Sequence, residues 1–301
     1  MSSRKAELLM ASVSLAWGSS YLLMKVGLDS ITPFNLIALR FGIAFVCMTV
    51  VFFKKFRSLN RKTLGKGVLM GSILFLIFTG MVCGVNHTTA STAGFLTSTT
   101  VILVPVLESI LKRSIPQKSV ILSICLALCG LFLLTAESGI TADKGALLCL
   151  MGAFFYAIYI LVLDKIAKKD DTLLISIIQL GVASLLGTIC MLLFETPSLP
   201  KTPIQWGAVI CLGLICSAYG FIVQPIAQKY ATPERIGLIF SLEPVFSAIL
   251  SYIFLHEILK AQGYVGATMI FLSVLLSEVV KGMKRSPVNR VGEIYDTKSY
   301  K

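Results

Sequence analysis

Charged residues are scarce in this sequence, and histidine is nearly absent. Asp, Glu, Lys and Arg make up 14% of the 301 residues, and only two residues are histidine. A soluble domain carries about 25% charged residues, so the composition excludes an ordinary soluble fold. The His-Glu-x-x-His motif of zinc peptidases does not occur.

Motifs of other enzymes and pumps are missing as well. No glycine-rich loop ending in Lys-Ser or Lys-Thr occurs, which excludes an ATP-driven pump with its nucleotide site on this chain. No Gly-x-Ser-x-Gly elbow of a serine hydrolase occurs. The eight cysteines lie in apolar runs, where Cys acts as a small apolar residue. We therefore expect no metal site, no cofactor, no structural disulfide and no enzymatic activity.

Apolar residues, by contrast, are abundant and gather in long runs. They make up 56% of the chain, and a helix that crosses a bilayer needs about 20 of them in succession. The runs predict an all-α membrane protein with ten transmembrane helices, at residues 8–26, 34–53, 67–86, 91–111, 119–136, 145–163, 172–194, 204–224, 236–255 and 261–280.

The net charge of +12 would suit a nucleic-acid-binding protein, but its distribution indicates membrane topology instead. If the N-terminus is cytoplasmic, 22 of the 27 Lys and Arg residues fall in cytoplasmic segments. Only Lys25, Lys144, Lys201 and Lys260 fall in outer segments. Cytoplasmic loops carry such an excess. We expect a multi-pass protein of the cell (plasma) membrane, with both termini cytoplasmic, basic loops near anionic membrane lipids, and no nucleic-acid partner.

The two halves of the chain resemble each other. Leu15-Ala16-Trp17-Gly18 matches Phe154-Phe155-Tyr156-Ala157, and Leu39-Arg40-Phe41-Gly42 matches Ile178-Gln179-Leu180-Gly181 at the same offset. Each half has five predicted spans, so the second half starts from the opposite side of the membrane. Inverted repeats of this kind build carriers whose substrate site lies between the repeats.

The similarity between the halves also sets the predicted domain boundaries. We expect the first five-helix repeat at 1–140 and the second, inverted one at 141–286. The segment 287–301 is a polar cytoplasmic tail with too little apolar surface to offset the entropy cost of folding.

Short motifs in the first, second and ninth spans resemble one family of transporters. The motifs are Trp17-Gly18-Ser19-Ser20, Arg40-Phe41, Ser241-Leu242-Glu243-Pro244-Val245 and His256-Glu257. Their order and the five-plus-five layout are similar to the EamA-type transporters of the drug/metabolite transporter superfamily. The resemblance implies a ten-helix carrier with a central cavity that moves small polar or amphipathic metabolites. In one departure, Lys112-Arg113-Ser114 stands after the fourth span, where the family often has an acid.

Two ionisable residues inside spans are candidates for substrate contact, because charges in lipid are costly and usually functional. Glu243 lies near the middle of span nine, before the helix-bending Pro244. Its carboxyl group can contact an ammonium group or carry a coupling proton, or it can join two helices by a hydrogen bond. Arg40 can bind a carboxylate with two hydrogen bonds, or extend outward to the membrane surface; we expect the outward arrangement.

Aromatic and polar side chains within the spans complete the candidate site. Trp17 and Tyr156 are matched positions in the two halves, and both can stack on a substrate or simply pack against neighbouring helices. The hydroxyl run 97–100 can bind substrate, but most of its members are expected to bond to backbone carbonyls and bend the helix. The full candidate set for substrate binding is Trp17, Tyr21, Arg40, Thr97, Tyr156, Tyr159, Gln179, Tyr219 and Glu243.

The sequence therefore predicts a secondary active transporter that works by alternating access. We expect it to export small metabolites such as amino acids or related amphipathic compounds, with a proton as the candidate coupling ion. The alternative from another class is an integral-membrane lipid-modifying enzyme that uses the paired acids Asp170 and Asp171 in a cytoplasmic loop. Replacing Asp171 would abolish such an enzyme and leave a carrier almost unaffected.

Overall fold

The computed structural model describes residues 3–111, 113, 118–135, 144–167, 172–228, 239–240 and 242–284. Within these residues the chain is helical and contains no β-strand. The first half comprises α1 (Ser3–Leu28), α2 (Pro33–Val51), a short 3₁₀ segment η1 (Phe53–Ser58), α3 (Arg61–His87), α4 (Ala90–Ser98), α5 (Thr100–Leu111) and α6 (Lys118–Thr135). The second half comprises α7 (Lys144–Ala167), α8 (Thr172–Phe194), α9 (Pro203–Cys211), the π-helix η3 (Leu212–Tyr219), α10 (Gly220–Gln228), α12 (Glu243–Leu255) and α13 (Ala261–Lys284).

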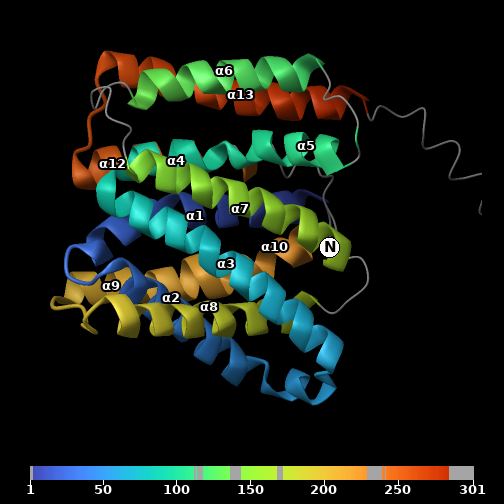
Figure 1. Cartoon of the computed structure of the whole chain (residues 1–301), viewed down its shortest axis with the longest axis vertical. Coiled ribbons are helices and arrows are strands. Elements are labelled where there is room, and N and C mark those ends of the chain that lie inside the picture. The colour runs from blue at the N-terminus through green and yellow to red at the C-terminus, as the bar shows by residue number, and fades with distance from the viewer. Residues whose placement is uncertain are drawn as a thin grey trace, which may run out of the picture.

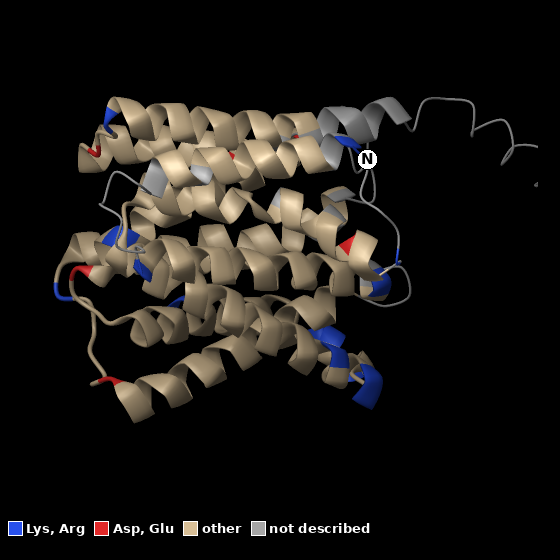
Figure 2. Ribbon diagram, turned by 45° about the horizontal axis from the view of Figure 1, so that its top comes forward, with Lys and Arg blue, Asp and Glu red and all other residues tan. Residues whose placement is uncertain are grey.

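The helices lie side by side in one bundle, with their connections at its two ends (Figure 1). Lys and Arg gather at these ends, and the middle of the bundle is nearly free of charge (Figure 2). Large apolar side chains such as Leu185, Leu192 and Phe194 of α8 are exposed on its outer surface. An apolar belt between two charged ends is the surface that lipid requires, so the chain is a multi-pass membrane protein.

Six helical stretches are long and apolar enough to cross a membrane on their own. They are Pro33–Val51, Arg61–His87, Ala90–Leu111, Lys144–Leu163, Thr172–Phe194 and Pro203–Gln224. The helices α1, α6, α12 and α13 occupy the remaining predicted spans but do not meet the same length and apolarity.

Three of the predicted spans are not single regular α-helices. The range 91–111 is divided between α4 and α5, and the range 204–224 includes the π-helix η3. For span nine we predicted a helix over 236–255 with Glu243 inside it, but α12 begins at Glu243. The start of that span and the tail 287–301 lie outside the described residues.

Helix starts at the ends of the bundle are capped by side chains. Asn60 accepts a hydrogen bond from the backbone N–H of Thr63, and Thr89 accepts one from Thr92. Thr202 and Gln205 form a reciprocal capping box at the start of α9. Such caps satisfy backbone N–H groups that the first turn of a helix leaves unpaired. They explain why α3, α4 and α9 start where they do.

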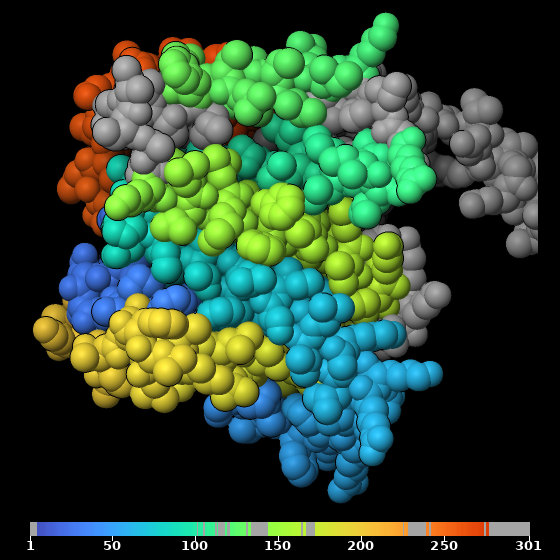
Figure 3. All heavy atoms as spheres, in the orientation of Figure 1, coloured from blue at the N-terminus to red at the C-terminus, as the bar shows by residue number. Residues whose placement is uncertain are grey.

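The two halves pack together through glycines. A Cβ atom added at Gly80 of α3 would lie 2.6 Å from the carbonyl oxygen of Leu148 and 2.7 Å from the backbone nitrogen of Gly152, both in α7. A Cβ at Gly84 would likewise collide with Sγ of Cys149 in α7. Small residues allow helix backbones to approach this closely in membranes. The helices α7, α3 and α8 accordingly form one continuous face of the molecule (Figure 3).

Gly80→Ala is expected to lower the free energy of unfolding by about 1–3 kcal/mol, because the new methyl group meets rigid backbone atoms of α7. Gly65 in the same helix is the matched control, because a Cβ there meets nothing within 4 Å. Gly65→Ala should leave stability unchanged or raise it by up to ~1 kcal/mol through helix propensity. Thermal melting of the two purified variants in detergent measures the difference; equal melting temperatures would rule out the close α3–α7 contact.

Candidate functional site

In span four the regular α-helix is broken at one residue, Thr99, and in span nine the helix α12 begins at Glu243. In span four, α4 ends at Ser98 and α5 begins at Thr100. The hydroxyls of Ser98, Thr99 and Thr100 donate to carbonyl oxygens three residues earlier, at 2.6–2.7 Å. The prediction that most of these hydroxyls bond to the backbone is therefore confirmed. The exception is Thr97, whose hydroxyl is buried without a hydrogen-bond partner.

Glu243 lies in the first turn of α12. This helix is 13 residues long, so Glu243 lies roughly 18 Å along the helix axis from Leu255. The carboxylate is half-buried, and Oε1 accepts a hydrogen bond of 3.0 Å from the hydroxyl of Tyr21 in α1. Tyr156 in α7 also lies near enough to Glu243 to interact with it electrostatically. A carboxyl group from the second half thus accepts a hydrogen bond from a hydroxyl of the first half.

Glu243 has no cationic partner among the residues that the structure describes. Tyr21 is its hydrogen-bond partner there. A carboxylate removed from water without a cation is unfavourable. The remaining carboxylate oxygen is therefore suited to bind an ammonium group or a proton.

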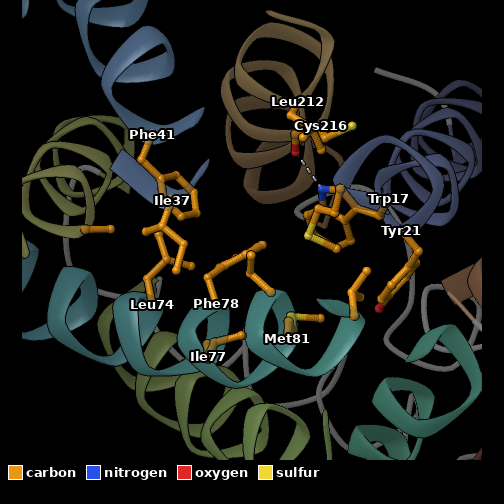
Figure 4. Packing of buried hydrophobic residues seen from close by; sticks show 14 of the residues in the cluster. Trp17, Tyr21, Ile37, Phe41, Leu74, Ile77, Phe78, Met81, Leu212 and Cys216 are labelled. Atoms are coloured by element: carbon orange, nitrogen blue, oxygen red, sulfur yellow. Dashed lines mark hydrogen bonds between the residues drawn. The ribbon is translucent and has the colours of Figure 1, made fainter. Parts of the chain in front are cut away.

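Trp17 is held in the interior of the bundle by the π-helix. Its Nε1 donates a hydrogen bond of 2.9 Å to the carbonyl oxygen of Cys216, shown as a dashed line in Figure 4. The indole ring stacks on Phe240 at 5.3 Å and contacts Phe221 at 5.9 Å between centroids. A Cβ at Gly220 would lie 2.5 Å from Nε1, so only glycine leaves room for the indole there. The π-helix is a local distortion of the kind often found at functional sites.

Arg40 does not extend to the membrane surface, so the expected outward arrangement is wrong. The residue is 1% exposed, and its Nε donates a hydrogen bond of 2.7 Å to the hydroxyl of Ser217 in η3. The guanidinium carbon lies 4.4 Å from the ring centroid of Phe78 in α3, so a cation–π contact adds to the hydrogen bond. These inward contacts replace water around the charge. No carboxylate pairs with Arg40 within the described part of the chain.

A second aromatic group comes from α7. The rings of Tyr156 and Tyr159 lie 6.1 Å apart, and the hydroxyl of Tyr159 donates to Oε1 of Gln179 at 2.9 Å. Phe221 contacts Tyr159 at 6.5 Å and also contacts Trp17. Phe221 therefore connects the aromatic side chains of the two halves.

The structure places Trp17, Tyr21 and Tyr159 in one hydrophobic core, and Tyr156 and Tyr219 pack against it. Hydrogen bonds join Glu243 to Tyr21 and Gln179 to Tyr159. The Tyr219 hydroxyl is 2.7 Å from that of Ser12 in α1. Sequence reasoning missed Phe221, Phe240 and Ser217. Gly220, beside Phe221, was the one available signal, because glycine within a span often marks close approach. Asp170 and Asp171 lie outside the described residues.

The chain is similar to known membrane transporters along most of its length. The profile of the EamA-like transporter family matches residues 4–136 and again residues 143–278. An "uncharacterized transporter" of Archaeoglobus fulgidus is 30% identical over 274 residues, which is 90% of this chain and 85% of the relative. The uncharacterized transporter YetK of Bacillus subtilis is 26% identical over 282 residues, or 88% and 84% of the two chains. A solved crystal structure has the same fold, with a TM-score of 0.66 at 19% identity over 92% of this chain and 98% of that one.

Proposed function

We propose a transport function from one premise: the chain belongs to the EamA-like transporter family. On this proposal it is a secondary active transporter that exports small amphipathic metabolites, such as amino acids, by alternating access. The observation that carries the proposal is Glu243, an acid without a described cationic partner, which is hydrogen-bonded to Tyr21 of the other half at the start of α12. Interrupted helices at the interface of two repeats are where secondary transporters bind substrates and ions.

The arrangement of two inverted repeats is part of the proposal, and the helix contacts support it. Several contacts between helices have a counterpart when the two halves are exchanged. The contact of α3 with α7 corresponds to the contact of α10 with α1, and that of α1 with α12 corresponds to that of α7 with α4 and α5. The pairs α2–α8, α4–α12 and α6–α13 each map onto themselves. Arg113 and His256, which follow spans four and nine, are the non-glycine residues with positive φ, at 50° and 54°, in the described part of the chain.

A ten-span topology with both termini in the cytoplasm follows from the same arrangement. The basic segment around η1 lies at the end of the bundle where the chain begins, which supports the cytoplasmic assignment of that end (Figures 1 and 2). The bacterial and archaeal relatives support the plasma membrane as the location.

The chemistry of the site supports an amphipathic substrate. Glu243 offers a carboxylate oxygen, Thr97 offers an unpaired hydroxyl, and Trp17 and Tyr156 offer aromatic surface. An ammonium group at Glu243 with an apolar body against the rings would use all of them. Arg40 supplies positive charge deeper in the bundle, where a substrate carboxylate would find a charge-assisted donor. Glu243 is also the group that would carry a coupling proton.

The proposal predicts that reconstituted protein moves at least one small amphipathic metabolite across liposomes. A panel of labelled amino acids and related amines is tested with and without a pH gradient, which separates coupled transport from facilitated exchange. Asp171→Asn is the control for a lipid-modifying enzyme: transport should persist within about twofold, because the proposed site does not include Asp171. Absence of transport across the panel, together with lipid turnover that depends on Asp171, would contradict the proposal.

A further inference from the structure

Glu257 of the second half forms hydrogen bonds to the start of α4 in the first half. Its Oε1 accepts a hydrogen bond from the backbone N–H of Ala90 at 3.0 Å, and Oε2 accepts bonds from the N–H and hydroxyl of Ser91 at 3.0 and 2.9 Å. His256, with φ 54°, turns the chain out of α12 so that Glu257 reaches α4. The carboxylate therefore satisfies backbone donors that the first turn of α4 leaves unpaired.

The contact between α4 and α12 continues inward from Glu257 toward the site. The hydroxyl of Ser247 in α12 donates to the carbonyl oxygen of Ala90 at 3.1 Å. A Cβ at Gly94 of α4 would lie 2.7 Å from that hydroxyl, and one at Gly18 of α1 would lie 2.7 Å from Cβ of Phe246. The helices α4 and α12 are thus packed together, with little space between them and α1.

We propose that Glu257 is a latch that holds the outer end of the transport path closed. The inference rests on the proposed function, which assigns this end of the bundle to the outside. Opening toward the outside requires α4 to separate from α12, and this separation breaks all three hydrogen bonds to Glu257. Hydrogen bonds to a charged group are stronger than neutral ones. Their loss favours the opened state when the carboxylate is removed.

The sequence contains the latch carboxylate in the second half but not at the matching place in the first half. The second half has Leu255-His256-Glu257 after span nine, whereas the first half has Lys112-Arg113-Ser114 at the matching place. Of these two matched sequences only the outer one contains an acid, so the latch stabilises outer closure without a matching carboxylate after the fourth span. The departure from the family pattern after the fourth span thus has a conformational consequence.

Glu195 provides a matched control at the same end of the bundle. It accepts hydrogen bonds from the N–H groups of Phe34 and Asn35 at 3.2 and 3.1 Å, and from the hydroxyl of Thr32. Its chemistry is that of Glu257, a carboxylate at a helix start supplied by the other half. However, it joins α8 to α2, which are both uninterrupted helices. Removing this carboxylate should affect stability without favouring the opened state.

The test measures access to the site from outside. A single cysteine at Ser98, beside the interruption in span four, is placed in a variant without the eight native cysteines and labelled in intact cells with a membrane-impermeant maleimide. We expect Glu257→Gln to increase the labelling rate about tenfold, and Ser91→Ala, which removes one of the three bonds, to increase it about threefold. Glu195→Gln should stay within twofold. Cysteines at Lys201 and Lys62, which are both exposed, calibrate outer and inner exposure.

Labelling needs no substrate, so the latch and the transport function are tested separately. An unchanged rate in Glu257→Gln, or an equal increase in Glu195→Gln, would overturn the latch even in a protein that transports. Should Glu257→Gln fail to accumulate, an unchanged rate in Ser91→Ala overturns it instead. A graded increase in Glu257→Gln and Ser91→Ala without transport of any metabolite would keep the latch and refute the transporter.

Discussion

Replacing Glu243 with glutamine is expected to abolish metabolite accumulation driven by a pH gradient, while substrate exchange at equal pH persists because the amide oxygen still accepts a hydrogen bond from an ammonium group. Glutamine keeps the size of the side chain and still accepts the hydrogen bond that Tyr21 donates to Oε1 of Glu243. It cannot take up or release a proton. If the carboxyl group exchanges its proton with one face and then the other, only the coupled step is lost. The measurement compares initial rates and final accumulation in liposomes with imposed gradients.

Glu108→Gln is the matched control for this experiment, because Glu108 is an exposed acid in α5. Its removal should leave gradient-driven accumulation within about twofold of the unsubstituted protein. Full accumulation by Glu243→Gln would reduce Glu243 to a hydrogen bond between α1 and α12. Loss of both accumulation and exchange would instead assign it to substrate binding alone.

Trp17→Ala is expected to lower the free energy of unfolding by about 3–5 kcal/mol and to abolish transport. The substitution removes a buried indole that stacks on Phe240, and it leaves the carbonyl oxygen of Cys216 without its donor. Large-to-small changes at packed positions cost about this much, and the unpaired carbonyl adds to the loss. Thermal melting in detergent and transport in liposomes measure the two effects.

The other tryptophan of the chain provides the comparison. Trp206 in α9 is 36% exposed, so Trp206→Ala should cost less than about 1 kcal/mol and leave transport unchanged. Trp17→Phe separates the two contributions of the indole, since phenylalanine retains ring stacking but cannot donate to Cys216. Melting curves that do not distinguish Trp17→Ala from Trp206→Ala would show that the indole is not held as the structure has it.

The all-helical membrane fold could be predicted from the sequence because it depends on local properties. Long apolar runs specify helices in lipid, and cap residues such as Thr89 and Thr202 stand where α4 and α9 begin. The hydroxyl run 97–100 indicated a bent helix, and the structure interrupts the helix at that position. In each case the residues that decide the structure lie within one turn of the feature.

The environment of Arg40 could not be predicted, because its partners come from distant parts of the chain. Phe78 approaches from α3, and Ser217 approaches from the π-helix in the second half. Periodicity within α2 shows that Arg40 lies in a span, but not which neighbours offer it an aromatic face or a hydroxyl. Likewise, Pro244 indicated a bend near Glu243, but the local sequence did not reveal that α12 begins there.

The glycine contact between α3 and α7 has a consequence for biosynthesis. α3 packs mainly on α7 and α8, and much less on the other helices of its own half. The ribosome must add about 80 residues after α3 before α7 is complete, which takes roughly 4–16 s at typical rates. During that interval Gly80 and Gly84 have no partner helix, so the nascent first half remains an unfinished, protease-sensitive intermediate. Translation stalled in this window should therefore yield a fragment that quality control removes rather than a stable half-transporter.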